Sequence, residues 1–123
     1  MEEFIRVPYG STVHGEEEID AVINVLKTTT QMSKNVREFE SKVAAKYSKD
    51  YGIMVNSGSS ALYLSIESLN LPMGSEVITP ALTFGTTVAS IVNNKLVPVF
   101  VDVKPDTYCI DETQIESKIT KNT

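Results

Sequence analysis

Val55-Asn-Ser-Gly-Ser-Ser-Ala61 connects an apolar run to a helical pattern, and the fold can be inferred outward from this junction. The preceding run, Gly52-Ile-Met-Val55, is short and apolar, which is typical of a strand that is covered on both faces. Beyond the junction, Leu62, Ile66 and Leu69 fall on one face of a helix. The sequence therefore predicts a strand, a turn of small residues and a helix, in that order.

The same cycle repeats toward the C-terminus. Residues 76–79 are expected to form a strand, residues 80–84 a loop, residues 86–93 a helix and residues 98–102 a third strand. Strands that alternate with helices are joined by crossovers, and such connections build a mainly parallel sheet.

Helical patterns flank this alternation on both sides. Residues 16–27 place acidic side chains before an apolar stripe of helical spacing, and residues 36–47 repeat that spacing. Asp111, followed by Gln114, resembles a capping box that would open a last helix ending near Ile119. We therefore expect two helices before the sheet and one after it.

The expected fold class is α/β, with N-terminal helices followed by βα repeats of a mainly parallel sheet. An N-terminal helical segment would occupy residues 1–50, and an α/β cofactor-binding domain would occupy residues 51–123. Three parallel strands leave edges that need further strands or cover, so the α/β domain is expected to be partial.

Composition excludes several classes of function. Sixteen acidic residues against eleven basic ones give a net charge of −5, and no basic run is present, which argues against nucleic-acid and anionic-membrane partners. No stretch approaches the roughly 18 apolar residues of a membrane span. The one cysteine, Cys109, and the one histidine, His14, suggest neither a disulfide nor a metal cluster. A cytoplasmic location is the simplest expectation.

The turn of small residues is the first candidate binding site. Backbone N–H groups at a helix start lack intrahelical acceptors, the helix dipole favours an anion there, and Gly58 would let a phosphate approach the main chain. Ser59 and Ser60 add hydroxyl donors. The alternative is that Ser57 or Ser59 only caps the helix. Because the segment matches neither GxxxxGK[ST] nor GxGxxG, a nucleoside triphosphate or a nicotinamide cofactor is disfavoured.

The second candidate is the loop after the next strand, which contains Phe84 and would lie at the same edge of the sheet. An aromatic ring there could stack on a planar ligand, and the alternative is an ordinary core phenylalanine. Asp102, at the end of the third strand, is interpreted as a turn residue. A phosphate site beside an aromatic ring suggests a flat phosphorylated cofactor.

Several ordered motifs resemble a known family, the DegT-type nucleotide-sugar aminotransferases, which are pyridoxal-phosphate (PLP) enzymes of fold type I. The resemblance covers nearly the whole chain and rests on the following segments: Gly15-Glu-Glu-Glu-Ile19, Val36-Arg-Glu-Phe-Glu40, Asn56-Ser-Gly-Ser-Ser-Ala61, Glu76-Val-Ile-Thr-Pro80, Thr83-Phe84, Pro98-Val-Phe-Val-Asp-Val103 and Ile110-Asp111.

The resemblance implies PLP as the cofactor and an incomplete portion of the fold type I large domain. It assigns the cofactor phosphate to Gly58, Ser59 and Ser60, and it assigns stacking on the pyridine ring to Phe84. Residues 28–34 resemble the family loop near the sugar site and the partner subunit, with Ser33 in place of the usual glycine.

The same resemblance implies an aminotransferase acting on a nucleotide-linked keto sugar, in cell-surface polysaccharide or deoxyamino-sugar biosynthesis. Family members carry the Schiff-base lysine and the aspartate that pairs with the pyridine nitrogen beyond the region that matches this chain. No catalytic residue is therefore assigned, and the 123-residue polypeptide is expected to be inactive alone. The alternatives are a fragment of a PLP-dependent nucleotide-sugar 3-dehydratase, in which histidine replaces the lysine, and a non-catalytic remnant or assembly module.

The implied partners are a nucleotide-sugar substrate and an amino donor. A homodimer, or association with a complementing chain, is expected because family members pair as dimers with active sites at the interface.

Overall fold

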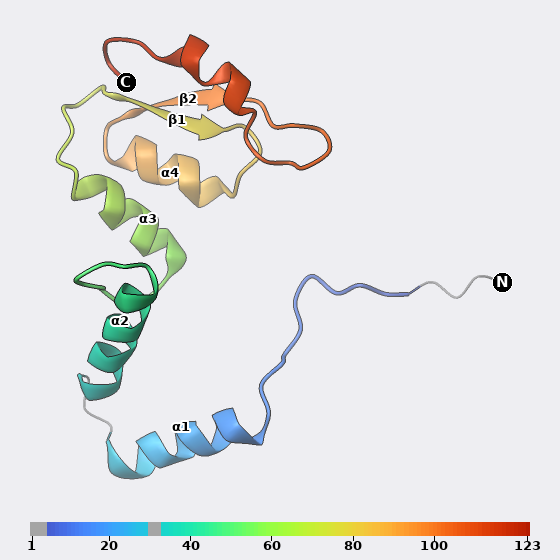
Figure 1. Ribbon diagram of the computed structural model, residues 1–123, viewed down its shortest axis with the longest axis vertical. Helices are drawn as coiled ribbons and strands as arrows, with labels where there is room; N and C mark the ends of the chain where they lie inside the picture. The colour runs from blue at the N-terminus through green and yellow to red at the C-terminus, as the bar shows by residue number, and fades with distance from the viewer. Residues whose placement is uncertain (1–4, 30–32) are drawn as a thin grey trace. The chain divides into compact units, whose positions relative to one another are not determined.

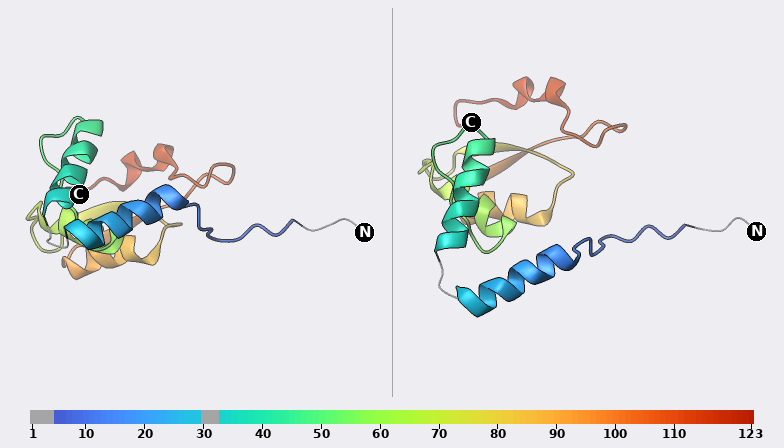
Figure 2. Two further views of the ribbon diagram at one scale, coloured as in Figure 1. Left: turned by 90° about the horizontal axis from the view of Figure 1, so that it is seen from below. Right: turned by 60° about the horizontal axis from the view of Figure 1, so that its bottom comes forward.

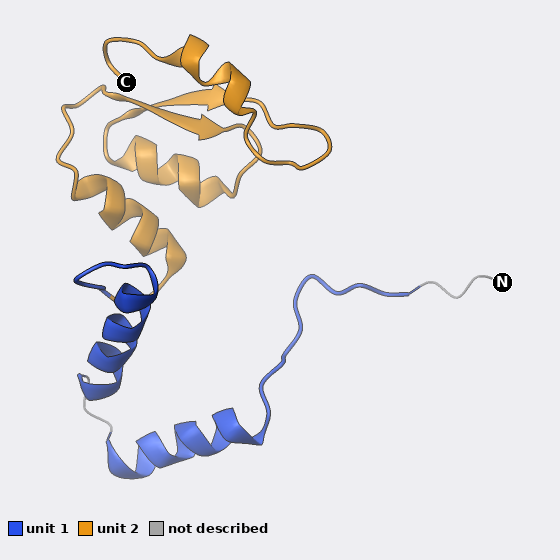
Figure 3. Cartoon of the chain, in the orientation of Figure 1, with its two compact units in different colours: residues 1–53 blue, residues 54–123 orange. Residues whose placement is uncertain are grey.

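The computed structural model describes residues 5–29 and 33–123, and the chain divides into two compact units, residues 1–53 and 54–123 (Figure 3). Each unit is described by itself. The proposed sugar-site loop at 28–34 is described only in part, because residues 30–32 lie outside the described residues. The division into an N-terminal segment and a cofactor-binding domain stays a prediction.

The first unit contains the two expected helices, α1 (Glu16–Thr28) and α2 (Lys34–Lys46) (Figure 1). At the start of α1, the backbone N–H of Gly15 donates to Oε2 of Glu18 over 2.7 Å. This hydrogen bond lowers the pKa of Glu18. The acidic first turn is therefore held in place by a backbone donor as well as by the helix dipole.

The apolar stripe of α1 is open to solvent. Its four residues are between 40% and 66% exposed, and they are Ile19, Val22, Ile23 and Leu26. In the described part of α2, the only buried side chain is that of Ala44. None of the helices in residues 5–29 and 33–123 is long and apolar enough to cross a membrane.

The prediction of a strand at residues 52–55 is wrong. This run adopts no regular secondary structure, and Ile53 and Met54 are 85% and 53% exposed. Gly52 instead lies close to α2, since a Cβ at this position would lie 2.6 Å from the carbonyl oxygen of Glu40. An apolar run becomes a strand only when a neighbouring strand supplies hydrogen bonds, and β-propensity alone does not supply them.

The second unit confirms the alternation of strands and helices. It contains α3 (Gly58–Glu67), β1 (Glu76–Pro80), α4 (Gly85–Asn93) and β2 (Val97–Val101). The two strands pair in parallel, from Glu76 opposite Val97 to Pro80 opposite Val101. The predicted α/β class is therefore confirmed, with a sheet of two strands in the described residues where three were expected.

The core of this unit lies under α4, which packs against both strands. Ile91 and Val101 are almost fully buried, and Leu96 is buried beside them. Figures 1 and 2 show α4 on one side of the strand pair and the C-terminal segment on the other. Burying one such aliphatic side chain contributes about 1.5–3 kcal/mol, so these residues hold α4 on the sheet.

The prediction of a last α-helix after Asp111 is wrong in helix type. Two short 3-10 helices form instead, η1 (Glu112–Gln114) and η2 (Glu116–Lys118). The Asp111 side chain does cap this segment, because it accepts hydrogen bonds from Thr113 and Gln114, which lower its pKa. Ile119 is extended, so too few residues follow the cap to repay the cost of starting an α-helix.

Asn94, at the end of α4, ties α4 to α3. Its Nδ2 donates to the carbonyl oxygen of Tyr63 in α3 over 3.2 Å and to that of Ser90 in α4 over 2.8 Å. The next residue, Lys95, has a φ of 60° and turns the chain toward β2. One half-buried amide therefore links the two helices that carry the candidate site.

We expect Asn94→Ala to destabilise the second unit by about 1 kcal/mol, because two hydrogen bonds are lost and two carbonyl groups lose a donor. Urea unfolding followed by circular dichroism measures this change. Asn93→Ala, at the exposed neighbouring position, is the control and should change stability by less than about 0.5 kcal/mol. Equal effects of the two substitutions would contradict the link between α3 and α4.

Candidate functional site

The start of α3 combines a cap with free donors. Ser57 is extended, and its Oγ accepts a hydrogen bond from the backbone N–H of Ser60 over 3.1 Å. Ser57 is therefore the residue that caps the helix. Helix geometry leaves the backbone N–H groups of Gly58 and Ser59 without intrahelical acceptors. Capping and anion binding are compatible here, because they use different donors.

The space in front of Gly58 is open. A Cβ built at this position would meet no heavy atom within 4 Å. The Ser59 side chain beside it is exposed. An anion therefore has room to approach the main chain at the helix start, as the sequence predicts.

Ser60 has a more restricted role than its neighbours. Its backbone N–H is engaged by Ser57, and its Oγ accepts a hydrogen bond from the Ser57 hydroxyl over 3.1 Å. Only the hydroxyl proton of Ser60 is left to donate to a ligand. Its assignment to the phosphate contact stays a prediction, and it can rest on the hydroxyl alone.

Phe84 is the residue that precedes α4, and its backbone is extended. Its side chain is 72% exposed, so it does not fill the core of the second unit. The interpretation of Phe84 as a core residue is therefore wrong for this structure. An exposed ring in the connection between β1 and α4 is available for stacking on a planar ligand.

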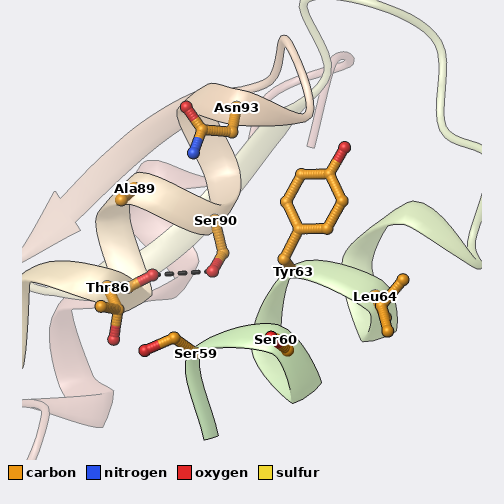
Figure 4. Close-up of a pocket in the computed structure, with 8 residues that line it drawn as sticks. All are labelled: Ser59, Ser60, Tyr63, Leu64, Thr86, Ala89, Ser90 and Asn93. Carbon is orange, nitrogen blue, oxygen red and sulfur yellow. Dashed lines mark hydrogen bonds between the residues drawn. The ribbon is translucent and has the colours of Figure 1, made fainter. Parts of the chain in front are cut away.

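Two adjoining hollows bring the predicted residues together. The Phe84 hollow has a volume of about 520 Å³ and is lined by Gly58, Ser59, Ala61, Leu62, Ser65, Phe84 and Thr86. The Tyr63 hollow has a volume of about 380 Å³ and is lined by Ser59, Ser60, Tyr63, Leu64, Thr86, Ala89, Ser90 and Asn93 (Figure 4). Three of the four predicted residues thus share one hollow, and Ser60 lines the next.

Electrostatic attraction in both hollows comes from dipoles. Among the residues that line them, none carries a charged side chain. The positive end of the α3 dipole, together with backbone N–H groups and hydroxyl groups, is what these hollows offer an anion.

The remaining candidates from the sequence lie elsewhere. The Oδ1 of Asp102 accepts a hydrogen bond from the N–H of Val103 over 2.8 Å, and the interpretation of Asp102 as a turn residue stays a prediction. Cys109 is an exposed free thiol. His14 belongs to the first unit and lines a hollow on α1.

Sequence reasoning missed two residues that shape the site, Thr86 and Asn94. Thr86 lines both hollows, and Asn94 joins the helices that form them. A polar residue at a helix end is too common a signal for either to have been selected from the sequence.

The residues present fit a flat phosphorylated ring. Gly58 and Ser59 offer hydrogen-bond donors to a phosphate, and Phe84 offers an exposed ring face in the same hollow. Fold and site together define an α/β protein with a parallel strand pair and a ligand hollow next to the residues that follow β1.

Comparison with known proteins identifies the family. The chain belongs to the DegT/DnrJ/EryC1/StrS aminotransferase family, whose model matches residues 12–123. The resemblance inferred from the sequence motifs is therefore confirmed.

Both curated relatives and solved structures agree with this assignment. The chain is 33% identical to the Bacillus subtilis spore coat polysaccharide biosynthesis protein SpsC, over 95% of this chain and 30% of the relative. It is 32% identical to the B. subtilis 3-oxo-glucose-6-phosphate:glutamate aminotransferase, over 87% of this chain and 25% of that relative.

A solved structure aligns over 98% of this chain. It is the Escherichia coli GDP-4-keto-6-deoxy-D-mannose-3-dehydratase with bound hydrated PLP. This enzyme is 30% identical to the chain, with a TM-score of 0.88, and the alignment covers 33% of the enzyme's length. The chain thus spans a quarter to a third of the length of these proteins. It is a partial family domain related to sugar aminotransferases and sugar dehydratases.

Proposed function

We propose that residues 1–123 form the cofactor-phosphate-binding part of a cytoplasmic PLP-dependent aminotransferase that acts on a nucleotide-linked keto sugar. The observation that carries this proposal is the single hollow shared by Gly58, Ser59 and Phe84. A helix start of small residues suits a phosphate, and an exposed ring in the same hollow suits a planar heterocycle. The family relationship supplies the identity of the cofactor.

The residues of this chain would bind and orient. The backbone N–H groups of Gly58 and Ser59, with the hydroxyls of Ser59 and Ser60, would hold the phosphate, and Phe84 would cover one face of the ring. PLP, when bound, supplies an electron sink for reactions at an amine-bearing carbon. The family lysine falls outside the portion that this chain matches, so we propose that the 123-residue polypeptide is inactive alone.

The second candidate is a fragment of a nucleotide-sugar 3-dehydratase. It is favoured by the alignment with the E. coli dehydratase over nearly the whole chain. The two candidates share the proposed binding site. They differ at the position of the Schiff-base lysine, which aminotransferases keep and dehydratases replace with histidine. A complete sequence with lysine at that position would support the aminotransferase, and one with histidine would support the dehydratase.

Titration of the purified chain with PLP, followed through the ³¹P resonance of the phosphate, should show saturable binding. We expect Ser59→Ala with Ser60→Ala to weaken binding by at least about tenfold, because two hydroxyl donors to a charged group are lost. The phosphate signal reports on the binding site without requiring the lysine.

Ser68→Ala with Ser75→Ala is the matched control for this titration. Neither residue lines either hollow, and both hydroxyls donate to backbone carbonyl groups in the chain. The control should bind PLP as the unsubstituted chain does. A folded chain that shows no saturable binding would refute the proposed site.

Replacing the exposed ring tests the second contact. Phe84→Leu should weaken PLP binding by about twofold to tenfold, the range expected for loss of aromatic stacking. Binding of inorganic phosphate should be unchanged, since that ion has no ring to stack. Phe100→Leu, at an exposed aromatic residue of β2, is the control. A parallel loss of phosphate affinity in Phe84→Leu would indicate a folding defect and count against stacking.

We further propose that the chain associates with a second copy or with a complementing chain through the apolar stripe of α1. The exposure of Ile19, Val22, Ile23 and Leu26 supports this proposal, because apolar residues on one helix face gain stability when they are covered. Association through α1 is also what the alternative of a non-catalytic assembly module requires.

Val22→Lys should reduce association, since it places a charge in the apolar stripe at an already exposed position. Sedimentation equilibrium over a range of concentrations measures the change as a fall in average mass. Ala21→Lys, which lies on the opposite face of the helix by its spacing, should leave association intact. An unsubstituted chain that is a monodisperse monomer at all concentrations would refute the proposal.

A further inference from the structure

Thr86 lies beside the proposed phosphate site but has no role in it so far. It is the second residue of α4, it is half-buried, and it lines both the Phe84 hollow and the Tyr63 hollow. The only other polar residue that lines both hollows is Ser59, which the proposed function already assigns to the phosphate. Figure 4 shows these two side chains on facing sides of the gap between α3 and α4.

The two adjacent threonines of α4 differ in what their hydroxyl groups do. The Oγ1 of Thr87 accepts a hydrogen bond from the Oγ1 of Thr83 over 3.0 Å, and Thr87 lines neither hollow. The side chain of Thr86 instead lines the two hollows. Its backbone carbonyl accepts a hydrogen bond from the buried Ser90 hydroxyl over 2.7 Å, which fixes the first turn of α4.

The distance between Thr86 and Ser59 is set by the packing of their helices. Asn94 joins α4 to α3 through the Tyr63 carbonyl, and α4 is held on the sheet by buried Ile91. A ligand that contacts both side chains would therefore meet donors that are already in position, which reduces the entropic cost of binding.

We infer that the Thr86 hydroxyl is a further ligand of the cofactor phosphate, donating a hydrogen bond from α4 across the gap from Ser59. This inference rests on the proposed function, and it assigns the site to two helices rather than to α3 alone. A phosphate has three terminal oxygens that accept strong hydrogen bonds, so donors from two directions can be used at once.

The test compares three variants of the full chain by ³¹P titration with PLP and with inorganic phosphate. Thr86→Val keeps the shape of the side chain and removes the hydroxyl, and it should weaken the binding of both probes by about tenfold. Thr86→Ser keeps the hydroxyl and should bind within about twofold of the unsubstituted chain. Thr87→Val is the matched control, because Thr87 lines neither hollow, and the phosphate affinity of this variant should not change.

The outcomes separate this inference from the proposed function. If the unsubstituted chain binds PLP and Thr86→Val binds equally well, the role of Thr86 is refuted while the phosphate site at α3 stands. If Thr86→Val and Thr87→Val lose affinity equally, the loss reflects α4 stability and the inference is also refuted. If the unsubstituted chain binds neither probe, both the proposed function and the inference fail.

Discussion

The packing of α4 against the strand pair is the contact on which the candidate site depends. Ile91 and Val101 are almost fully buried there, so α4 has one position on β1 and β2. That position also fixes the start of α4, and Phe84 directly precedes it. Through Asn94 it also places α3, whose first turn supplies the backbone donors. The geometry of the Phe84 hollow is thus a consequence of the same apolar contacts that stabilise the unit.

The local sequence pattern correctly predicted the strands and helices that pack against one another in the second unit. It failed for the run at 52–55, whose structure depends on a partner strand. The segments expected at 76–79, 86–93 and 98–102 agree with the observed elements within one residue at each end. The run at 52–55 has the same apolar character but forms no strand, because strand formation depends on a hydrogen-bonding partner that sequence pattern does not specify. At the other end of the chain, Asp111 caps as expected, but capping selects where a helix begins and does not decide its type or length.

The candidate site was predictable to the extent that it follows from topology. In parallel βα units, the residues after neighbouring strands lie at one edge of the sheet, and this rule selected Gly58 and Phe84 for one site. The two residues do line one hollow, although the strand expected before Gly58 does not form. Which hydroxyl groups are available is a different question, because it depends on individual contacts. The sequence gives no means of knowing that Ser57 engages the N–H of Ser60, or that Thr83 engages Thr87 and not Thr86. Such pairings depend on the side-chain rotamer of each residue, which a local sequence pattern does not specify.

The neutrality of the two hollows fits a segment that is shared by relatives named for different reactions. The proposed site consists of N–H groups, hydroxyls and an aromatic face, and no residue that lines the hollows carries a charged group to take or give a proton. Relatives named as an aminotransferase and as a dehydratase align with nearly the same residues of this chain. If residues 1–123 only bind and orient the cofactor, as we propose, then the choice between amino transfer and elimination must be made by groups outside them. The phosphate site could then stay unchanged while the catalytic residue differs between the two enzymes.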